Sequence, residues 1–215
     1  EVIFFFTFFW YNFYSVSTLH VSIGFIWPLL SFPIFHVEVF TVPLLNTLLL
    51  VSSGISITWT HKMILKRNKE FSYYYSLIGL LYTIFCGYCF LKLQEYEYKT
   101  LLLTFTSAIY GSLFFITTGF HGFHVFIGLC FLIFCFFRLL FYHFTYEHHL
   151  GLKFAIWYWH FVDVIWLIVY LFYYVLIQYS KLAVQVFTEN IFKKKLHFKF
   201  WSSTSFCSWC ASINY

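Results

Sequence analysis

Two histidines stand three residues apart inside a strongly apolar segment, FHGFHVFIG at residues 120–128. Their spacing places His121 and His124 on one face of a helix, where imidazole nitrogens can ligate a haem iron or another metal. A b-type haem site would pair one of them with His160 from a facing helix. The same rings can instead donate hydrogen bonds to neighbouring helices or to lipid phosphates. The spacing alone leaves the haem, metal and structural interpretations open.

A second polar pair lies in WYWHFVDVIW, where His160 and Asp163 are three residues apart. They therefore share a helix face. An imidazole that donates a hydrogen bond to a carboxylate satisfies both groups, as burial requires. We expect a structural polar pair here, with a proton relay or a carboxylate-oriented metal histidine as the alternative.

Few other residues in the sequence are candidates for a chemical role. Glu1 and Arg138 fall within or beside apolar segments, where a charged group is costly and is a functional candidate by default. We expect His148 and His149 to lie in a water-exposed connection. The C-x-x-C pairs at 86–89 and 207–210 lack a second pair at zinc spacing, so we expect no metal or redox role for them.

The composition indicates what kind of molecule positions these groups. Of 215 residues, 61% are hydrophobic and only 10% are charged, and the mean hydropathy is +0.78. Soluble domains carry about 25% charged residues, so the sequence predicts a membrane protein. The formal net charge of +5 is small and lies mostly at segment ends and in the C-terminal tail. We therefore expect lipid headgroups and no nucleic acid as its partners.

Apolar segments separated by polar ones predict five transmembrane helices in an all-α, polytopic helix bundle. We expect them at residues 1–19, 42–64, 71–93, 106–141 and 151–179. The sequence KLQEYEYKT at 92–100 is expected to form a short polar connection, with Glu95 and Glu97 exposed.

Small residues in the fourth apolar segment predict close helix contacts. Ser107 and Gly111 are four residues apart, as are Thr118 and Gly122. This spacing lets helices approach closely in lipid, and we expect the same of Gly119.

Basic residues indicate the orientation of the bundle. The connections after the second and fourth segments hold Lys62, Lys66, Arg67, Lys69, Arg138 and Lys153. The opposite connections hold only Lys92 and Lys99. The positive-inside rule predicts that the first side faces the matrix or cytoplasm, although five lysines in the tail weaken this asymmetry.

Six blocks of sequence share their order and spacing with one known family. The longest are AIYGSLFFITTGFHGFHVFIG at 108–128 and FYHFTYEHHLGLKFAIWYWHFVDVIWLIVY at 141–170. The others are VPLLNT, SGISITWTH, LQEYEY and the opening EVIFFF. Together they resemble subunit III of mitochondrial cytochrome c oxidase. The resemblance implies a transmembrane domain of subunit III type at 1–180 and a divergent tail at 181–215.

That family has seven helices, and the resemblance aligns the five segments with helices three to seven. The first two family helices form one arm of a lipid-filled cleft. We expect upstream residues or a separate chain to supply that arm. Glu1 corresponds to the family's membrane-embedded carboxylate, which faces the cleft.

The resemblance implies a non-catalytic core subunit of cytochrome c oxidase, respiratory complex IV, in the mitochondrial inner membrane. Its expected roles are to support proton uptake, bind phospholipids and stabilise subunit I during electron transfer from cytochrome c to oxygen. No cofactor is expected on this chain, and haem a and copper are expected on partner subunits. The expected protein partners are subunit I as the main contact, subunit II and accessory subunits.

The resemblance also implies roles for single residues. Arg138 and His143, with His124 nearby, match positions associated with phospholipid headgroups, where a guanidinium donates to a phosphate. His148 and His149 match a matrix-facing connection whose exposed imidazoles collect protons. His160 and Asp163 match the signature of the last helix.

One position departs from the family pattern. Lys153, in HHLGLKF, stands where the family usually has glutamate. An ammonium replaces a carboxylate there, so we expect no proton-collecting role at this position.

Two other functions remain as alternatives. The first is a free-standing b-type cytochrome that uses His121 or His124 together with His160. The second is a transporter or channel built on Asp163 and Arg138, which the absence of an inverted sequence repeat disfavours.

Overall fold

The protein is helical in every regular element that the structure describes. A computed structural model covers the chain and describes residues 1–17, 40–65, 69–101, 104–106, 109–144 and 148–176. The helices are α1 (Val2–Ser17), α2 (Val42–Ile64), α3 (Lys69–Thr100), α4 (Ile109–Leu140) and α5 (Leu150–Tyr170), which continues into a π-helical turn, Leu171–Val175. The predicted all-α fold class is confirmed. The predicted tail at 181–215 lies outside the described residues.

Four helices are long and apolar enough to cross a membrane. Their candidate spans contain 23, 29, 30 and 26 residues, at Val42–Ile64, Ser72–Thr100, Gly111–Leu140 and Leu150–Val175. Each exceeds the roughly 20 residues that a bilayer core requires. The first predicted span appears as α1, a 16-residue helix.

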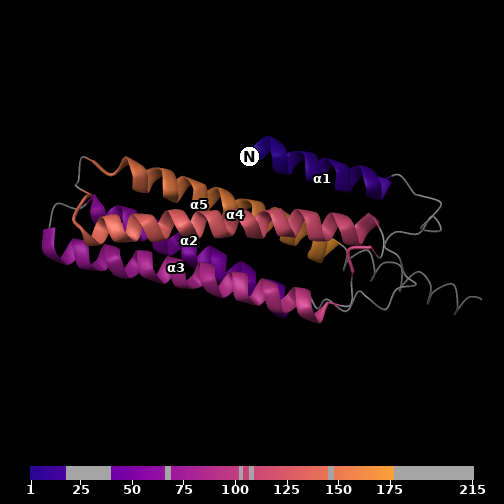
Figure 1. Ribbon diagram of the computed structural model, residues 1–215, viewed down its shortest axis with the longest axis horizontal. Coiled ribbons are helices and arrows are strands. Elements are labelled where there is room, and N and C mark those ends of the chain that lie inside the picture. The colour runs from indigo at the N-terminus through magenta and orange to yellow at the C-terminus, as the bar shows by residue number, and fades with distance from the viewer. Residues whose placement is uncertain (18–39, 66–68, 102–103, 107–108, 145–147, 177–215) are drawn as a thin grey trace, which may run out of the picture.

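The four long helices form a closed bundle with α1 on its outside (Figure 1). Around the bundle, α2 packs along α3, α3 against α4, α4 against α5, and α5 back against α2. Helix α1 contacts α4 and starts midway along the bundle. The outward faces carry large apolar side chains such as Phe126, Phe134 and Trp157. A surface of this kind suits a lipid environment.

Trp159 of α5 holds the bundle together at its centre. Its fully buried indole Nε1 donates a hydrogen bond to Ser53 Oγ of α2 at 2.9 Å. A Cβ added at Gly87 of α3 would lie 2.6 Å from the indole ring, and one at Gly128 of α4 would lie 3.0 Å from it. These two positions therefore need glycine so that three helices can close on one side chain.

The predicted close contacts at Gly119 and Gly122 are not found among the described residues. A Cβ at either position would meet nothing within 4 Å. The prediction was wrong because the motif spacing identifies a face of α4 but not its neighbour. The close contact of α4 occurs instead at Gly128.

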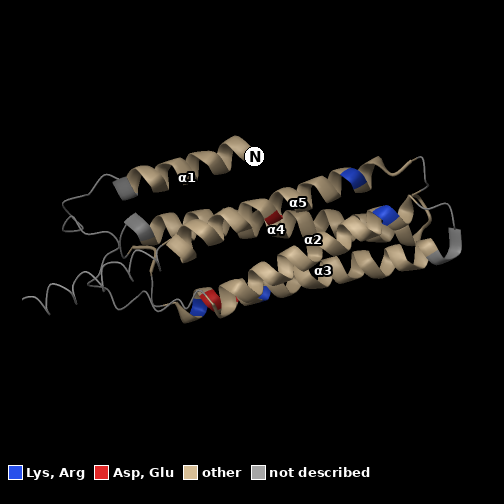
Figure 2. Ribbon diagram, turned by 180° about the vertical axis from the view of Figure 1, so that it is seen from behind, with Lys and Arg blue, Asp and Glu red and all other residues tan. Residues whose placement is uncertain are grey.

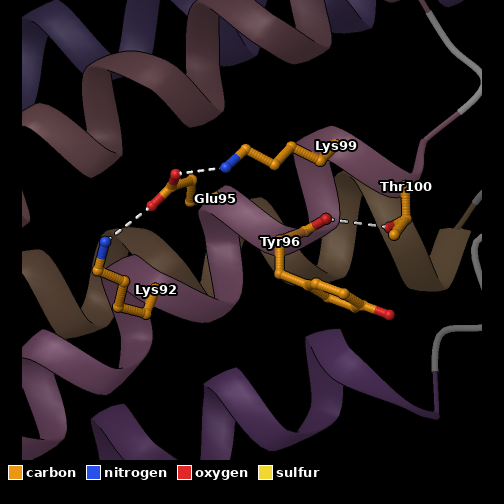
Figure 3. Close-up of polar contacts among 5 residues, drawn as sticks. All are labelled: Lys92, Glu95, Tyr96, Lys99 and Thr100. Carbon is orange, nitrogen blue, oxygen red and sulfur yellow. Dashed lines mark hydrogen bonds and ion pairs between the residues drawn. The ribbon is translucent and has the colours of Figure 1, made fainter.

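The predicted polar connection at 92–100 is also wrong, because α3 continues as a helix to Thr100. Figure 3 shows Glu95 between Lys92 and Lys99, with carboxylate–ammonium distances of 3.0 and 2.7 Å. These pairs at helical spacing support the last turns of the helix. Lys92, Glu95 and Lys99 occupy one exposed face, so the segment KLQEYEYKT is an amphipathic helix end.

Charged residues lie mainly near the two ends of the bundle (Figure 2). Lys62, Arg138 and Lys153 lie where α2 and α4 end and α5 begins. We call this the basic end of the bundle. Lys92 and Lys99 lie toward the other end of α3, as the spacing of basic residues predicts. Lys66 and Arg67 lie outside the described residues.

Candidate functional site

Glu1 contacts one of the two motif histidines midway along the bundle. Its Oε2 lies 2.7 Å from His124 Nε2. His124 Nδ1 lies 2.7 Å from the carbonyl oxygen of Phe120, which can only accept, so Nδ1 carries a proton. One further proton is therefore shared between His124 Nε2 and the Glu1 carboxyl group. It lies either on the ring, which gives an ion pair, or on the carboxyl group, which then donates to a neutral ring.

Aromatic rings hold α1 at this position. The buried Phe5 ring meets His124 edge-on at 5.0 Å, and Phe4 meets Phe120 edge-on at 5.2 Å. Phe5 also contacts Phe161 of α5 at 6.1 Å. Glu1 and His124 are 123 residues apart in the sequence. No local pattern predicts this pairing, and the sequence identified the two residues only as separate candidates.

His121 points into the core, away from any shared site with His124. Its Nε2 lies 3.3 Å from the carbonyl oxygen of Val162, to which it donates. Its ring lies between Phe90 and Trp166, at 5.6 and 5.1 Å. His121 and His124 are close together on α4, but their rings contact different neighbours.

The histidines considered for haem or metal binding contact three different partners. His160 Nε2 lies 3.1 Å from Thr58 Oγ1, whereas His121 contacts α5 and His124 contacts Glu1. Within the described ranges, no group of three or more His, Cys, Asp or Glu residues is arranged to hold a metal ion. The geometry does not bring these three rings together.

His160 and Asp163 both lie against Gly54 of α2, but they do not bond to each other. A Cβ at Gly54 would lie 2.7 Å from Asp163 Oδ2 and 3.6 Å from His160 Nδ1. The other ring nitrogen, His160 Nε2, is hydrogen-bonded to Oγ1 of Thr58, one turn further along α2. Asp163 Oδ1 is buried without a hydrogen-bond partner among the described residues. The two side chains share a helix face, as predicted. The expected hydrogen bond between them is not formed, and His160 bonds to Thr58 instead.

Arg138 and His143 both lie at the basic end, where their backbones are joined by a hydrogen bond. The Arg138 guanidinium lies over the Phe144 ring at 4.9 Å, and the His143 amide donates to the Arg138 carbonyl oxygen at 3.0 Å. His143 and His148 are exposed. His124 lies 14 residues from Arg138 along α4, a rise of about 21 Å. One headgroup therefore cannot contact both.

His149 departs from its expected exposure. Only 5% of its surface is accessible, and its ring lies 5.6 Å from the ring of His61 at the end of α2. The reason is its position immediately before α5, where the chain passes close to α2. Of the two predicted proton-collecting histidines, only His148 is exposed.

Glu97 is a buried polar residue that the sequence analysis placed in an exposed connection. Only 3% of its surface is accessible, and Gln94 and Tyr174 are among its polar neighbours. Next to it in sequence, the Tyr98 hydroxyl donates to Thr118 Oγ1 at 2.7 Å. If residues 92–100 are taken as a helix, the burial of Glu97 can be predicted from the sequence. Gln94 and Glu97 then share one face, and the exposed Lys92, Glu95 and Lys99 lie on the opposite face.

Comparisons with known proteins cover most of the chain. Residues 1–178 match the family model described as Cytochrome c oxidase subunit III. Over 171 residues the chain is 46% identical to Cytochrome c oxidase subunit 3 of Patiria pectinifera, which covers 80% of this chain and 64% of that protein. The corresponding proteins of Anopheles gambiae and Drosophila melanogaster are 44% and 43% identical, each over 80% of this chain and 63% of their own length. The chain thus spans slightly less than two thirds of these relatives.

Proposed function

Because the chain belongs to the cytochrome c oxidase subunit III family, we propose that it is a non-catalytic core subunit of respiratory complex IV. In this proposal the haem a and copper centres lie on partner subunits, and subunit I is the main contact, with subunit II and accessory subunits beyond it. The proposed location is the mitochondrial inner membrane, with several membrane crossings. The observation that carries the proposal is the family match, which extends over all five described helices.

Phospholipid binding at the basic end is the second part of the proposal. Arg138 and His143 are the proposed headgroup contacts. In support, no ion pair joins Arg138 to any acidic side chain that the structure describes, so its donors remain for an anionic oxygen. Packing over Phe144 orients the guanidinium plane without consuming those donors.

Proton handling is the third part of the proposal. Exposed His148 collects protons at the basic end, and the Glu1–His124 contact holds one proton midway along the bundle. The support for this role is the hydrogen bond from His124 to Phe120, which leaves a single shared proton between ring and carboxyl group.

His160 and Asp163 have a structural role in this proposal. Together they fill the space beside Gly54 and hold α5 against α2. The hydrogen bond that His160 Nε2 donates to Thr58 Oγ1 supports this role, because the Thr58 hydroxyl itself donates to the Gly54 carbonyl oxygen.

Affinity purification tests the assignment to complex IV. A tagged chain isolated from inner mitochondrial membranes in mild detergent should bring haem a and copper with it in constant ratio. The preparation should oxidise reduced cytochrome c with consumption of oxygen. The chain separated from its partners should show no haem absorption.

The opposite result would favour the cytochrome alternative. A b-type Soret band in constant ratio to the separated polypeptide would overturn the proposal. Loss of that band in a His160→Leu variant would then identify the ligand.

A further inference from the structure

Two imidazole rings, those of His61 and His149, lie next to each other at the basic end without hydrogen-bond partners among the described residues. The rings of His61 and His149 are 5.6 Å apart and inclined by 52°. Both ring nitrogens of His149, and Nε2 of His61, are buried and bond to no described residue. Each neutral ring carries an N–H donor, and an unsatisfied buried donor is costly. The pair therefore calls for a ligand that supplies acceptors.

The electrostatic surroundings favour an anion as that ligand. Lys153, one turn into α5, is close enough to the His61 ring to interact with it electrostatically. The two residues at 149 and 153 lie beside the N-terminus of α5, where the helix dipole is positive. The first turn of α5 contains no acidic residue to offset this charge.

We propose that His61, His149 and Lys153 form a binding site for a phosphate group. Phosphate oxygens only accept hydrogen bonds, so they match two imidazole donors and an ammonium. A divalent cation would have only two ring ligands and would be repelled by Lys153. A water molecule would satisfy a ring donor but would leave the charge of Lys153 unpaired.

Arg138 lies near the same end of α5, because a Cβ at Gly151 would be 3.3 Å from its guanidinium. The proposed site requires neither complex IV nor any other part of the proposed function.

The phosphate can come from a phospholipid headgroup or from free phosphate, and the experiment separates the two. In the first arm, the full chain, delipidated in a phosphate-free detergent solution, is titrated with radiolabelled inorganic phosphate by equilibrium dialysis. In the second arm, the chain is purified in the presence of phosphatidylglycerol, and retained lipid is counted by native mass spectrometry. Diacylglycerol, which has no phosphate, serves as the reference lipid.

Lys153→Gln should weaken phosphate or phosphatidylglycerol binding about tenfold, the effect of losing one charge-assisted hydrogen bond. Lys62→Gln is the matched control, because it removes a neighbouring charge from the exposed side of α2. It should leave binding unchanged. His149→Gln should also weaken binding, and circular dichroism establishes that each variant is folded.

Each outcome decides the proposal. A Lys153-dependent signal in the first arm identifies free phosphate, and one in the second arm alone identifies a lipid headgroup. If the Lys153 and Lys62 variants lose equal affinity for phosphate, binding depends only on the general positive charge of this end, and the proposed site is refuted. Absence of Lys153-dependent binding in both arms would mean that the histidines hold water alone.

Discussion

At the scale of single residues, the contact between Glu1 and His124 joins the start of the chain to the middle of α4. It is short, and the aromatic rings of Phe4 and Phe5 lie beside the His124 ring. Replacing the His124 imidazole by a phenyl group would leave the Glu1 carboxyl group without this partner. Replacing the Glu1 carboxyl group by an amide would keep a donor for His124 Nε2.

We therefore expect His124→Phe to loosen α1 from α4, while Glu1→Gln keeps it in place. Amide hydrogen exchange over Val2–Ser17 measures the difference, since exchange is faster where packing is lost. The first variant should exchange faster than the unchanged chain, and the second should match it. Equal exchange in all three proteins would show that the aromatic contacts alone hold α1.

Arg138 offers a second test at this scale. Arg138→Leu should reduce the phospholipid that copurifies with the chain and shorten the working life of the enzyme. Arg138→Lys should restore only part of the lipid, because an ammonium lacks the planar fork of a guanidinium. Unchanged lipid content and turnover stability in the leucine variant would rule out a phosphate clamp.

At the scale of the elements, α5 sets the spacing of the bundle through Trp159. Gly87→Ala would bring a methyl group to 2.6 Å from the indole ring, and Gly122→Ala would meet nothing within 4 Å. We expect the first substitution to lower the free energy of unfolding by about 1–3 kcal/mol. The second should be neutral or slightly stabilising, since alanine is the better helix former.

Denaturant titration in detergent micelles measures both variants against the unchanged chain. Similar stabilities for the two alanine variants would mean that the bundle adjusts around Trp159 without cost. A large loss at Gly122 would mean that this face of α4 is packed within the chain, against the described geometry.

The elements also show where sequence reasoning succeeds and where it stops. The bounds of α2 match the prediction of 42–64, because an apolar run with proline in its first turn is a local signal. The end of α3 was missed because polar residues at helical spacing resemble a loop in composition. Close packing at Gly87 and Gly128 could not be predicted, because it depends on the position of Trp159 in another helix.

Site residues follow the same division. Arg138 and His143 are near each other in sequence, and their proximity was predictable. The contacts of Glu1 with His124, His61 with His149, and His160 with Thr58 join different helices. Their partners depend on how the helices pack, which a single sequence does not specify.

At the scale of the whole molecule, the basic end and the opposite end should lie on different sides of the membrane. A cysteine in place of Lys62 should react with a membrane-impermeant thiol reagent only from the matrix side, as the positive-inside rule predicts. A cysteine in place of Lys99 should react only from the other side. The unsubstituted chain supplies the background labelling, and reaction of both variants from one side would contradict the topology.

The central place of Trp159 has a consequence for biogenesis. The indole lies in the last of the five helices to leave the ribosome, yet it contacts α2, α3 and α4. Until α5 has inserted, the ring of His121 lacks its partner on that helix, whereas the hydroxyl groups of Ser53 and Thr58 still donate to carbonyl oxygens of α2. A nascent chain stopped before residue 150 therefore leaves the His121 ring without this hydrogen bond, and an unsatisfied polar group is costly inside a membrane.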